Sequence, residues 1–242
     1  MSRHRVALMW TLGYVAGLGL VAPDTASAQV YRVEPRQSVN FNVGYFALRG
    51  ADSRVEGDVL FVDQESLAFE IDDFNFATIG GEYLFGVSEY LDVGAGLGFY
   101  QRTVPSVYSR FTHADGSEIE QDLKLRVIPI TATVRFLPIG RGGVEPYVGA
   151  GIGFFNWRYS EVGEFVDFSD ESIFTARYSA SGSEAGPVIF GGIRAAVADV
   201  WLIGGELRYQ KAEGTIENAE DFLSDRIDLG GWTTSFTIGL RF

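Results

Sequence analysis

Trp232-Thr-Thr-Ser-Phe-Thr-Ile-Gly-Leu-Arg-Phe242, the last eleven residues of the chain, alternate between two kinds of side chain. The even-numbered residues are mostly apolar, with an aromatic residue at each end, whereas the odd-numbered ones are small or polar. Because successive side chains of a strand point to opposite faces, this stretch predicts a strand with one apolar and one polar face. Ending on an aromatic residue is typical of a transmembrane barrel, where the last strand pairs with the first.

Seven earlier segments show the same alternation. They are Ser38–Leu48, Phe74–Phe85, Leu91–Gln101, Leu125–Phe136, Val144–Arg158, Gly186–Val197 and Trp201–Gln210. Each has about the length that a tilted strand needs to cross a bilayer. With the terminal segment they predict eight strands.

The connections between these segments alternate in length. Three of them are short and lie at Gly86–Tyr90, Leu137–Gly143 and Ala198–Val200. The other four are 19 to 25 residues long and cover residues 49–73, 104–124, 160–184 and 211–229. Short turns at one end and long loops at the other are typical of a barrel with both termini in the periplasm. The sequence therefore predicts an all-β fold, an eight-stranded antiparallel up-and-down transmembrane β-barrel over residues 38–242.

The first long connection leaves the strand count open. Val59–Val62 and Leu67–Ile71 are apolar, and Asp63–Ser66 between them has the composition of a turn. We interpret this hairpin as an extension of the first two strands beyond the membrane, and a ten-stranded barrel is the alternative. Both counts are even, as two termini on one side require.

The first 28 residues have the organisation of a secretory signal peptide. Arg3 and Arg5 precede an apolar run at Val6–Ala22, and Ala26-Ser27-Ala28 has the small-residue pattern of a cleavage site. We predict cleavage near Ala28, which leaves residues 29–37 as a short periplasmic segment before the barrel. A single membrane anchor is the alternative, but the run contains glycines and is close to the lower length limit for a spanning helix.

Acidic residues dominate the charge of this chain. The net charge is −13, and the four long connections hold 24 acidic residues against seven basic ones. Nucleic acid is therefore not an expected partner, because a phosphate backbone requires a basic surface. Solvation of the loops is one explanation of these carboxylates. A second hypothesis is that they bind divalent cations that bridge to lipopolysaccharide phosphates.

Eight charged residues lie on the polar face of the predicted strands. They are Glu82, Asp92, Arg135, Glu145, Arg194, Glu206, Arg208 and Arg241. A soluble ligand-binding barrel lines its interior with apolar residues, but here the apolar face is the larger and more continuous one, so we assign it to lipid. An eight-stranded barrel is just wide enough to be filled by side chains, and an unpaired charge there is costly. We predict an internal salt-bridge network, with single charges facing a wet lumen as the alternative.

Large apolar side chains also occur on the face that points into the predicted barrel, near the long connections. They are Phe46, Leu48, Phe155, Trp157, Val188 and Phe190. One hypothesis is that they line an apolar pocket for a small hydrophobic solute. The other is that they plug the mouth of the barrel.

Three motifs carry a resemblance to a known group: Ala26-Ser27-Ala28, Pro146-Tyr-Val-Gly-Ala-Gly-Ile-Gly-Phe154 and the stretch from Ser235 to Phe242. With them the chain resembles the small outer-membrane β-barrels of Gram-negative bacteria, the OmpA/OmpX/OmpW-like group, and is most similar to its OmpW-like branch. The resemblance implies a bacterial outer membrane with its lipid and lipopolysaccharide, long acidic loops outside and termini in the periplasm. It also implies a C-terminal signal for the barrel-assembly machinery, formed by Phe236, Ile238, Leu240 and Phe242.

The group has varied functions, so the resemblance leaves two classes open. We predict a structural or surface-interaction role, and the alternative is a narrow channel or carrier for small hydrophobic solutes, as in OmpW-like relatives. An enzyme is not expected, because His113 is the only histidine after signal removal and no G-x-S-x-G motif occurs. No cofactor or metal site is predicted.

Overall fold

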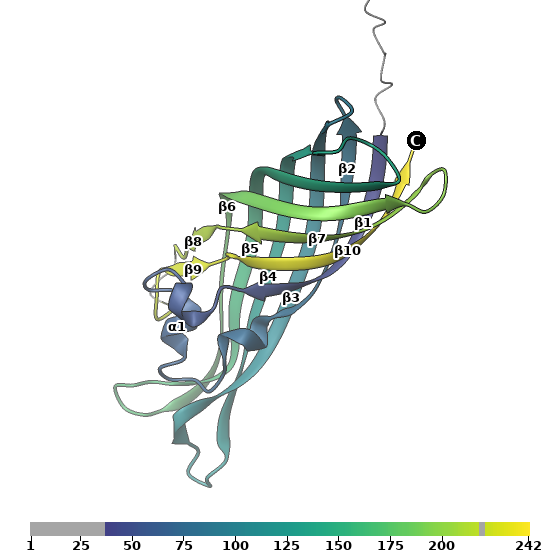
Figure 1. The fold of residues 1–242 in the computed structure, drawn as a ribbon. Helices are drawn as coiled ribbons and strands as arrows, with labels where there is room; N and C mark the ends of the chain where they lie inside the picture. The colour runs from purple at the N-terminus through teal and green to yellow at the C-terminus, as the bar shows by residue number, and fades with distance from the viewer. Residues whose placement is uncertain (1–36, 218–220) are drawn as a thin grey trace, which may run out of the picture. The chain divides into compact units, whose positions relative to one another are not determined.

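The computed structural model describes residues 37–217 and 221–242, so the predicted signal peptide and nearly all of segment 29–37 lie outside the described residues. Eight strands form a closed antiparallel barrel in the order β1-β10-β7-β6-β5-β4-β3-β2 (Figure 1). They are β1 (Gln37–Leu48), β2 (Phe76–Gly86), β3 (Leu91–Thr112), β4 (Glu118–Phe136), β5 (Val144–Val166), β6 (Ile173–Ala196), β7 (Trp201–Gln210) and β10 (Gly231–Arg241). The eight-stranded up-and-down barrel is confirmed, and the ten-stranded alternative is wrong.

The barrel closes between its first and last strands. β1 pairs with β10 in register from Ser38 opposite Arg241 to Leu48 opposite Gly231. Hydrocarbon offers no hydrogen bonds, so a closed ring of strands is what allows a sheet to sit in lipid. Gly44 lets the two strands approach closely, since a Cβ there would lie 2.6 Å from the carbonyl oxygen of Thr234.

The outward face of the barrel is apolar. Its exposed side chains include Phe41, Val43, Ile79, Leu97, Ile130, Ile152, Ile189 and Phe236. Phe41 is 65% exposed and Ile79 is 58% exposed, far more than such residues show inside a water-soluble core. This orientation, with apolar side chains outside and small or charged ones inside, is the one that the alternation predicts.

Strands β3 to β6 continue well beyond the other four, toward the end that carries the long connections (Figure 1). We call this end the loop end and the opposite one the turn end. Residues 101–112, 118–126, 158–166 and 173–181 form what we call the extended sheet. The prediction that residues 104–124 and 160–184 are loops is therefore mostly wrong. The cause is a change of the outward face from apolar to polar beyond Phe99 on β3 and Ile128 on β4, while the inward face stays largely apolar.

The inner face of the extended sheet is covered by the first and last long connections. The first contains the 3-10 helix η1 (Ala51–Ser53), the helix α1 (Val59–Asp63) and the 3-10 helix η2 (Ile71–Phe74), and the last contains the hairpin β8 (Glu213–Thr215) and β9 (Arg226–Asp228). The predicted strand hairpin in the first connection is wrong, because α1 is helical and buries Val59 and Leu60 completely. The Asp58 side chain caps α1 by accepting a hydrogen bond from the Phe61 amide. No helix in residues 37–217 and 221–242 is long and apolar enough to cross a membrane.

Candidate functional site

Charged side chains fill the lumen near the turn end. All eight predicted charges are ion-paired there, together with Arg141 from the β4–β5 turn, and they fall into two groups. In the first group, the Asp92 carboxylate binds Arg141 and lies 2.9 Å from Nη2 of Arg194. The Glu145 carboxylate lies 2.5 Å from Nε of Arg194 and 2.8 Å from Nη2 of Arg241. Neither Asp92 nor Glu145 is more than 1% exposed. Among the described residues, these arginines are the cations within 4 Å of the two carboxylates.

The second group of ion pairs is centred on Arg135. Its Nη2 lies 2.8 Å from Glu82 on β2 and 3.2 Å from Glu206 on β7. Arg208 binds the other oxygen of Glu206 at 2.9 Å. The guanidinium carbon of Arg135 also lies 4.0 Å from the centre of the Tyr147 ring, a cation–π contact. Because each buried charge faces an opposite one, the attraction between them offsets part of the cost of placing charges in a narrow bore.

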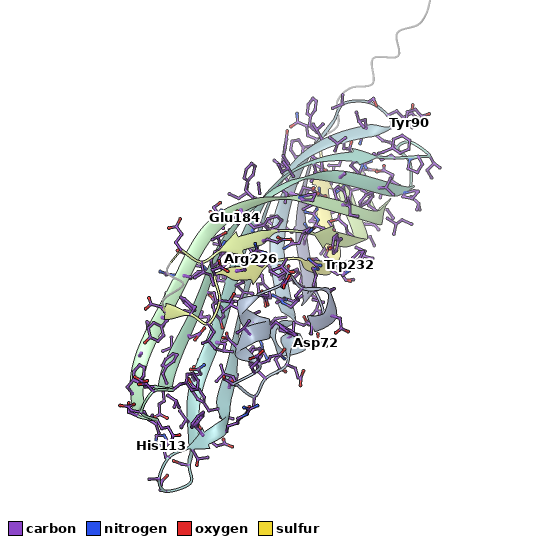
Figure 2. The ribbon with its side chains drawn as sticks, turned by 90° about the vertical axis from the view of Figure 1, so that its left-hand side faces the viewer. Asp72, Tyr90, His113, Glu184, Arg226 and Trp232 are labelled. Carbon is purple, nitrogen blue, oxygen red and sulfur yellow. The ribbon has the colours of Figure 1, made fainter. Side chains whose placement is uncertain are left out.

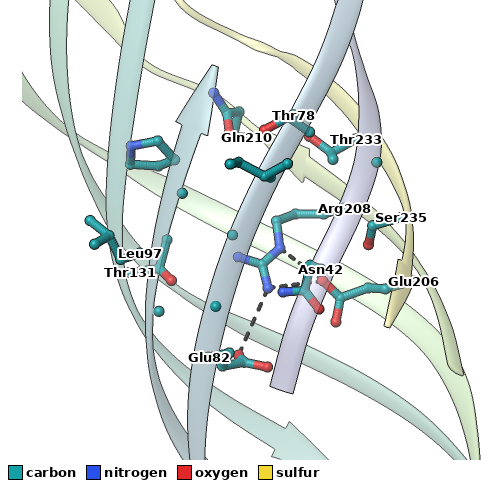
Figure 3. Close-up of a pocket in the computed structure, with 17 residues that line it drawn as sticks. Asn42, Thr78, Glu82, Leu97, Thr131, Glu206, Arg208, Gln210, Thr233 and Ser235 are labelled. Atoms are coloured by element: carbon teal, nitrogen blue, oxygen red, sulfur yellow. Dashed lines mark hydrogen bonds and ion pairs between the residues drawn. The ribbon is translucent and has the colours of Figure 1, made fainter. Parts of the chain in front are cut away.

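A small polar cavity lies next to this layer, on its loop-end side. Its volume is about 80 Å³, and its lining includes Asn42, Gly80 and Thr131. In Figure 3, Arg208 reaches toward Glu82 and Glu206 at one side of the cavity, while Thr78, Gln210 and Thr233 lie at the other. A space of this size, with several polar side chains in its wall, has room for a few water molecules.

The predicted apolar pocket residues separate into two places. Five of them pack in one core cluster at the loop-end half of the barrel: Phe46, Leu48, Phe155, Trp157 and Val188. Each of these five is at most 5% exposed. Phe190 lies instead nearer the turn end, where its ring centre is 6.3 Å from that of Tyr147. Its position follows from its register opposite Gly149 on β5 and Arg208 on β7.

His113 lies at the tip of the extended sheet, far from Tyr90 at the turn end (Figure 2). Its Nε2 is 2.9 Å from Glu164 on β5. Both side chains are about one third exposed, at 30% and 35%. Hydrogen bonding to His113 holds the pKa of the Glu164 carboxyl below its usual value. Such a contact is an ordinary surface hydrogen bond between strand ends.

The four residues of the predicted C-terminal signal lie on one face of the last strand. Phe236, Ile238, Leu240 and Phe242 all point outward, and Phe242 is 68% exposed. The backbone of Phe242 still pairs with that of Gln37 through two hydrogen bonds of 3.0 and 2.9 Å. The terminal aromatic ring is therefore held in place at the turn end by the first strand.

Sequence reasoning missed a basic patch on the outward face of the extended sheet. It consists of Lys124, Arg126, Arg158 and Arg177, and it borders a concavity of about 450 Å³. Arg126 and Arg158 are directly opposite each other on β4 and β5. Among the described residues, no carboxylate lies within 4 Å of these four cations. The signal in the sequence was the alternation of basic and apolar residues in β4, where Lys124 follows Leu123 and Arg126 follows Leu125.

Comparison with known proteins finds similarity in structure. No protein-family model matches the chain, and no curated protein matches its sequence. The crystal structure of the outer membrane protein OprG from Pseudomonas aeruginosa is 12% identical with a TM-score of 0.51, and the match covers 86% of this chain and 95% of that one. Ail of Yersinia pestis is 12% identical with a TM-score of 0.47, covering 87% and 100%. The outer membrane protein W of E. coli is 18% identical with a TM-score of 0.36, covering 85% and 97%.

At these identities the likeness concerns the fold, and of these three structures OprG has a TM-score above 0.5. The match to OprG extends over nearly the whole of that protein and over the described barrel of this chain. The closed strand order and the apolar outward face are those expected of a barrel in an outer membrane. The chain thus has the eight-stranded barrel fold of the small outer-membrane proteins.

Proposed function

We propose that this protein is a non-enzymatic outer-membrane barrel with a structural and surface-interaction role. Its long acidic connections face the outside and its termini face the periplasm. The supporting observation is the contrast between the two halves of the molecule. The bore is occupied by ion pairs and packed aromatic rings, whereas β3 to β6 carry the extended sheet beyond the apolar band. A filled barrel is suited to anchoring, and an extended sheet is suited to presenting a surface.

Planar-bilayer conductance and whole-cell adherence test this proposal together. We expect the purified barrel to give no conductance steps, because ion pairs and packed apolar side chains fill its bore. We expect a deletion strain to lose adherence and to keep its uptake of hydrophobic solutes. A copy shortened at the tips 109–117 and 167–172 would then fail to restore adherence although it inserts normally. Stable conductance, or adherence that the shortened copy restores, would contradict the proposed role.

A narrow channel or carrier for small hydrophobic solutes is the second candidate function. The observation in its favour is the continuous apolar cluster that leads from the loop end into the barrel. A carrier would have to open this packing, since its members are buried against one another. Loss of solute uptake in the deletion strain, restored by the wild-type copy, would favour this candidate over the first.

Lipid partners follow from the outward face. The apolar band contacts lipid, and the exposed C-terminal residues provide the pattern that the barrel-assembly machinery recognises.

We further propose that the basic patch binds phosphate groups of lipopolysaccharide. Arg126 of the patch comes two residues before the outward-facing Ile128, on the loop-end side of the apolar band, so the patch lies at the height of lipid headgroups. Like charges directly opposite in a sheet are unfavourable, and a bridging phosphate would relieve the repulsion between Arg126 and Arg158.

Neutralising the basic patch tests this partner. In the quadruple variant Lys124→Gln, Arg126→Gln, Arg158→Gln, Arg177→Gln we expect the affinity for purified lipopolysaccharide to fall about tenfold or more, since each charge-assisted hydrogen bond contributes about 1.5–3 kcal/mol. The wild-type protein should bind dephosphorylated lipopolysaccharide as weakly as the quadruple variant binds the phosphorylated form. Arg110→Gln at the sheet tip is the matched control and should bind normally. Equal binding of the phosphorylated and dephosphorylated forms would refute the assignment.

A further inference from the structure

A cavity of about 170 Å³ lies at the loop end, between the extended sheet, the end of α1 and residues 221–223. Two kinds of side chain line it. The first kind is polar and buried: Asp63, Gln121 and Glu161. The second kind is aromatic: Tyr108, Phe165, Phe168, Phe174, Tyr178 and Phe222. The rim is open to solvent, because Phe168 is 57% exposed and Leu223 is 54% exposed.

The polar side chains of this cavity lack a cation. Asp63 is 2% exposed and Glu161 is 7% exposed, yet neither has a Lys, Arg or His partner among the described residues. Tyr159 donates its hydroxyl to Asp63 at 2.8 Å. Among the described residues, Oε1 of Glu161 and Oε1 of Gln121 have no hydrogen-bond partner. Buried acceptors without donors cost free energy, so these atoms are suited to a donor that enters the cavity.

Aromatic rings surround these acceptors. The ring of Tyr178 lies edge-on to Phe165, with centres 4.9 Å apart, and 6.3 Å from Phe222. Phe222 in turn lies 5.9 Å from Tyr159. The faces of aromatic rings attract cations, and their carbon atoms pack against alkyl groups. The lining therefore combines negative and apolar character in one small space.

We propose that this cavity binds a small alkylammonium ion, the protonated form of a primary amine. Its three N–H donors match the three acceptor groups, which are the carboxylates of Asp63 and Glu161 and the amide oxygen of Gln121. Its alkyl chain would lie against the rings. A calcium ion requires six to eight oxygen ligands, and no cluster of three or more acidic, histidine or cysteine side chains suited to a metal occurs in the described part of the chain.

Protons occupy the site when the amine is absent. Burial, assisted by the neighbouring Asp58, raises the pKa of Asp63 to about 7. Burial together with Asp63 raises the pKa of Glu161 to about 9. Besides each other, the titratable groups facing these acids are Asp58 with its partner Arg54, the hydroxyls of Tyr159, Tyr108 and Tyr178, and Asp221 at the rim. Binding of an ammonium ion favours the ionised acids, so it should release protons near neutral pH.

Calorimetric titration of the full mature protein in detergent with butylammonium chloride tests the proposal. In buffers of different ionisation enthalpy we expect binding with proton release. The affinity should rise between pH 5 and 9, by about tenfold per pH unit for each proton that binding releases, because the acids must lose protons to pair with the ligand. Tetramethylammonium, which has no N–H donor, should bind at least tenfold more weakly. Absence of butylammonium binding at pH 8, or equal binding of tetramethylammonium, would overturn the proposal.

Variants separate the site from general effects on folding. Glu161→Gln should lower the butylammonium affinity about tenfold or more and reduce the proton release, while Tyr178→Leu should lower affinity with proton release intact. Glu164→Gln, a neighbour on β5 that pairs with His113 outside the cavity, is the matched control and should bind as the wild type does. Retained heat-modifiable gel mobility would show that each barrel is folded. Unchanged affinity in both folded Glu161→Gln and Tyr178→Leu would contradict the assignment.

Discussion

Replacement of Glu145 with alanine is expected to destabilise the barrel by about 3–5 kcal/mol, the usual cost of removing one partner of a buried ion pair. The Glu145 carboxylate is fully buried and accepts hydrogen bonds from Arg194, Arg241 and the backbone amide of Gly142. Alanine would leave two arginines facing each other without this counter-ion. Equilibrium unfolding by urea in lipid vesicles measures the loss, and heat-modifiable gel mobility reports whether the barrel still closes.

A loop carboxylate provides the control for this effect. Asp115 lies at the tip of the extended sheet and is exposed, and its carboxylate accepts hydrogen bonds from the amide and hydroxyl of Ser117. Asp115→Ala should change stability by no more than about 0.5 kcal/mol. Equal effects of the Asp115 and Glu145 replacements would show that the lumen charges are hydrated singly, which was the alternative to paired charges.

The strands and their faces were predictable because alternation is a local property. Glu82 and Glu206 lie far apart in sequence, yet each could be assigned to the lumen from its own neighbours. Which arginine meets which carboxylate was not predictable, since this depends on the stagger between strands around the barrel. Arg141 was missed for a related reason. It lies in a turn, where alternation assigns no face.

The loop end was harder to predict. Strands were expected to end where their outward face lost its apolar residues, but β3 to β6 continue because their inward face stays apolar, as at Val104, Leu123 and Leu125. The partner of that inward face comes from distant segments, among them α1, whose short apolar run could not be distinguished from a strand. The cavity with Asp63 and Glu161 arises from this long-range packing. Neither residue had a local signal that marked it as buried.

The second large effect is expected from Trp157→Ala. Trp157 on β5 is 2% exposed, and its indole fills the space beside two glycines: a Cβ on Gly182 would lie 2.9 Å from Nε1, and one on Gly214 would lie 2.7 Å from it. Removing a buried tryptophan side chain costs about 3–5 kcal/mol, through lost burial and an unfilled cavity. Unfolding by urea in vesicles, as for Glu145, measures this loss.

The same variant also tests whether aromatic packing closes the barrel. Trp157 pairs with Val127, and the next inward pair toward the turn end, Phe155 with Pro129, reaches the wall of the polar cavity. Alanine at position 157 would remove part of the packing between that cavity and the loop end, and we expect small conductance steps in planar bilayers. Trp232→Ala, on the outward face at 47% exposure, is the matched control and should give none. If the Trp157→Ala protein is destabilised but gives no conductance steps, the ion-paired layer at the turn end is sufficient to close the bore. The aromatic cluster then contributes to stability alone.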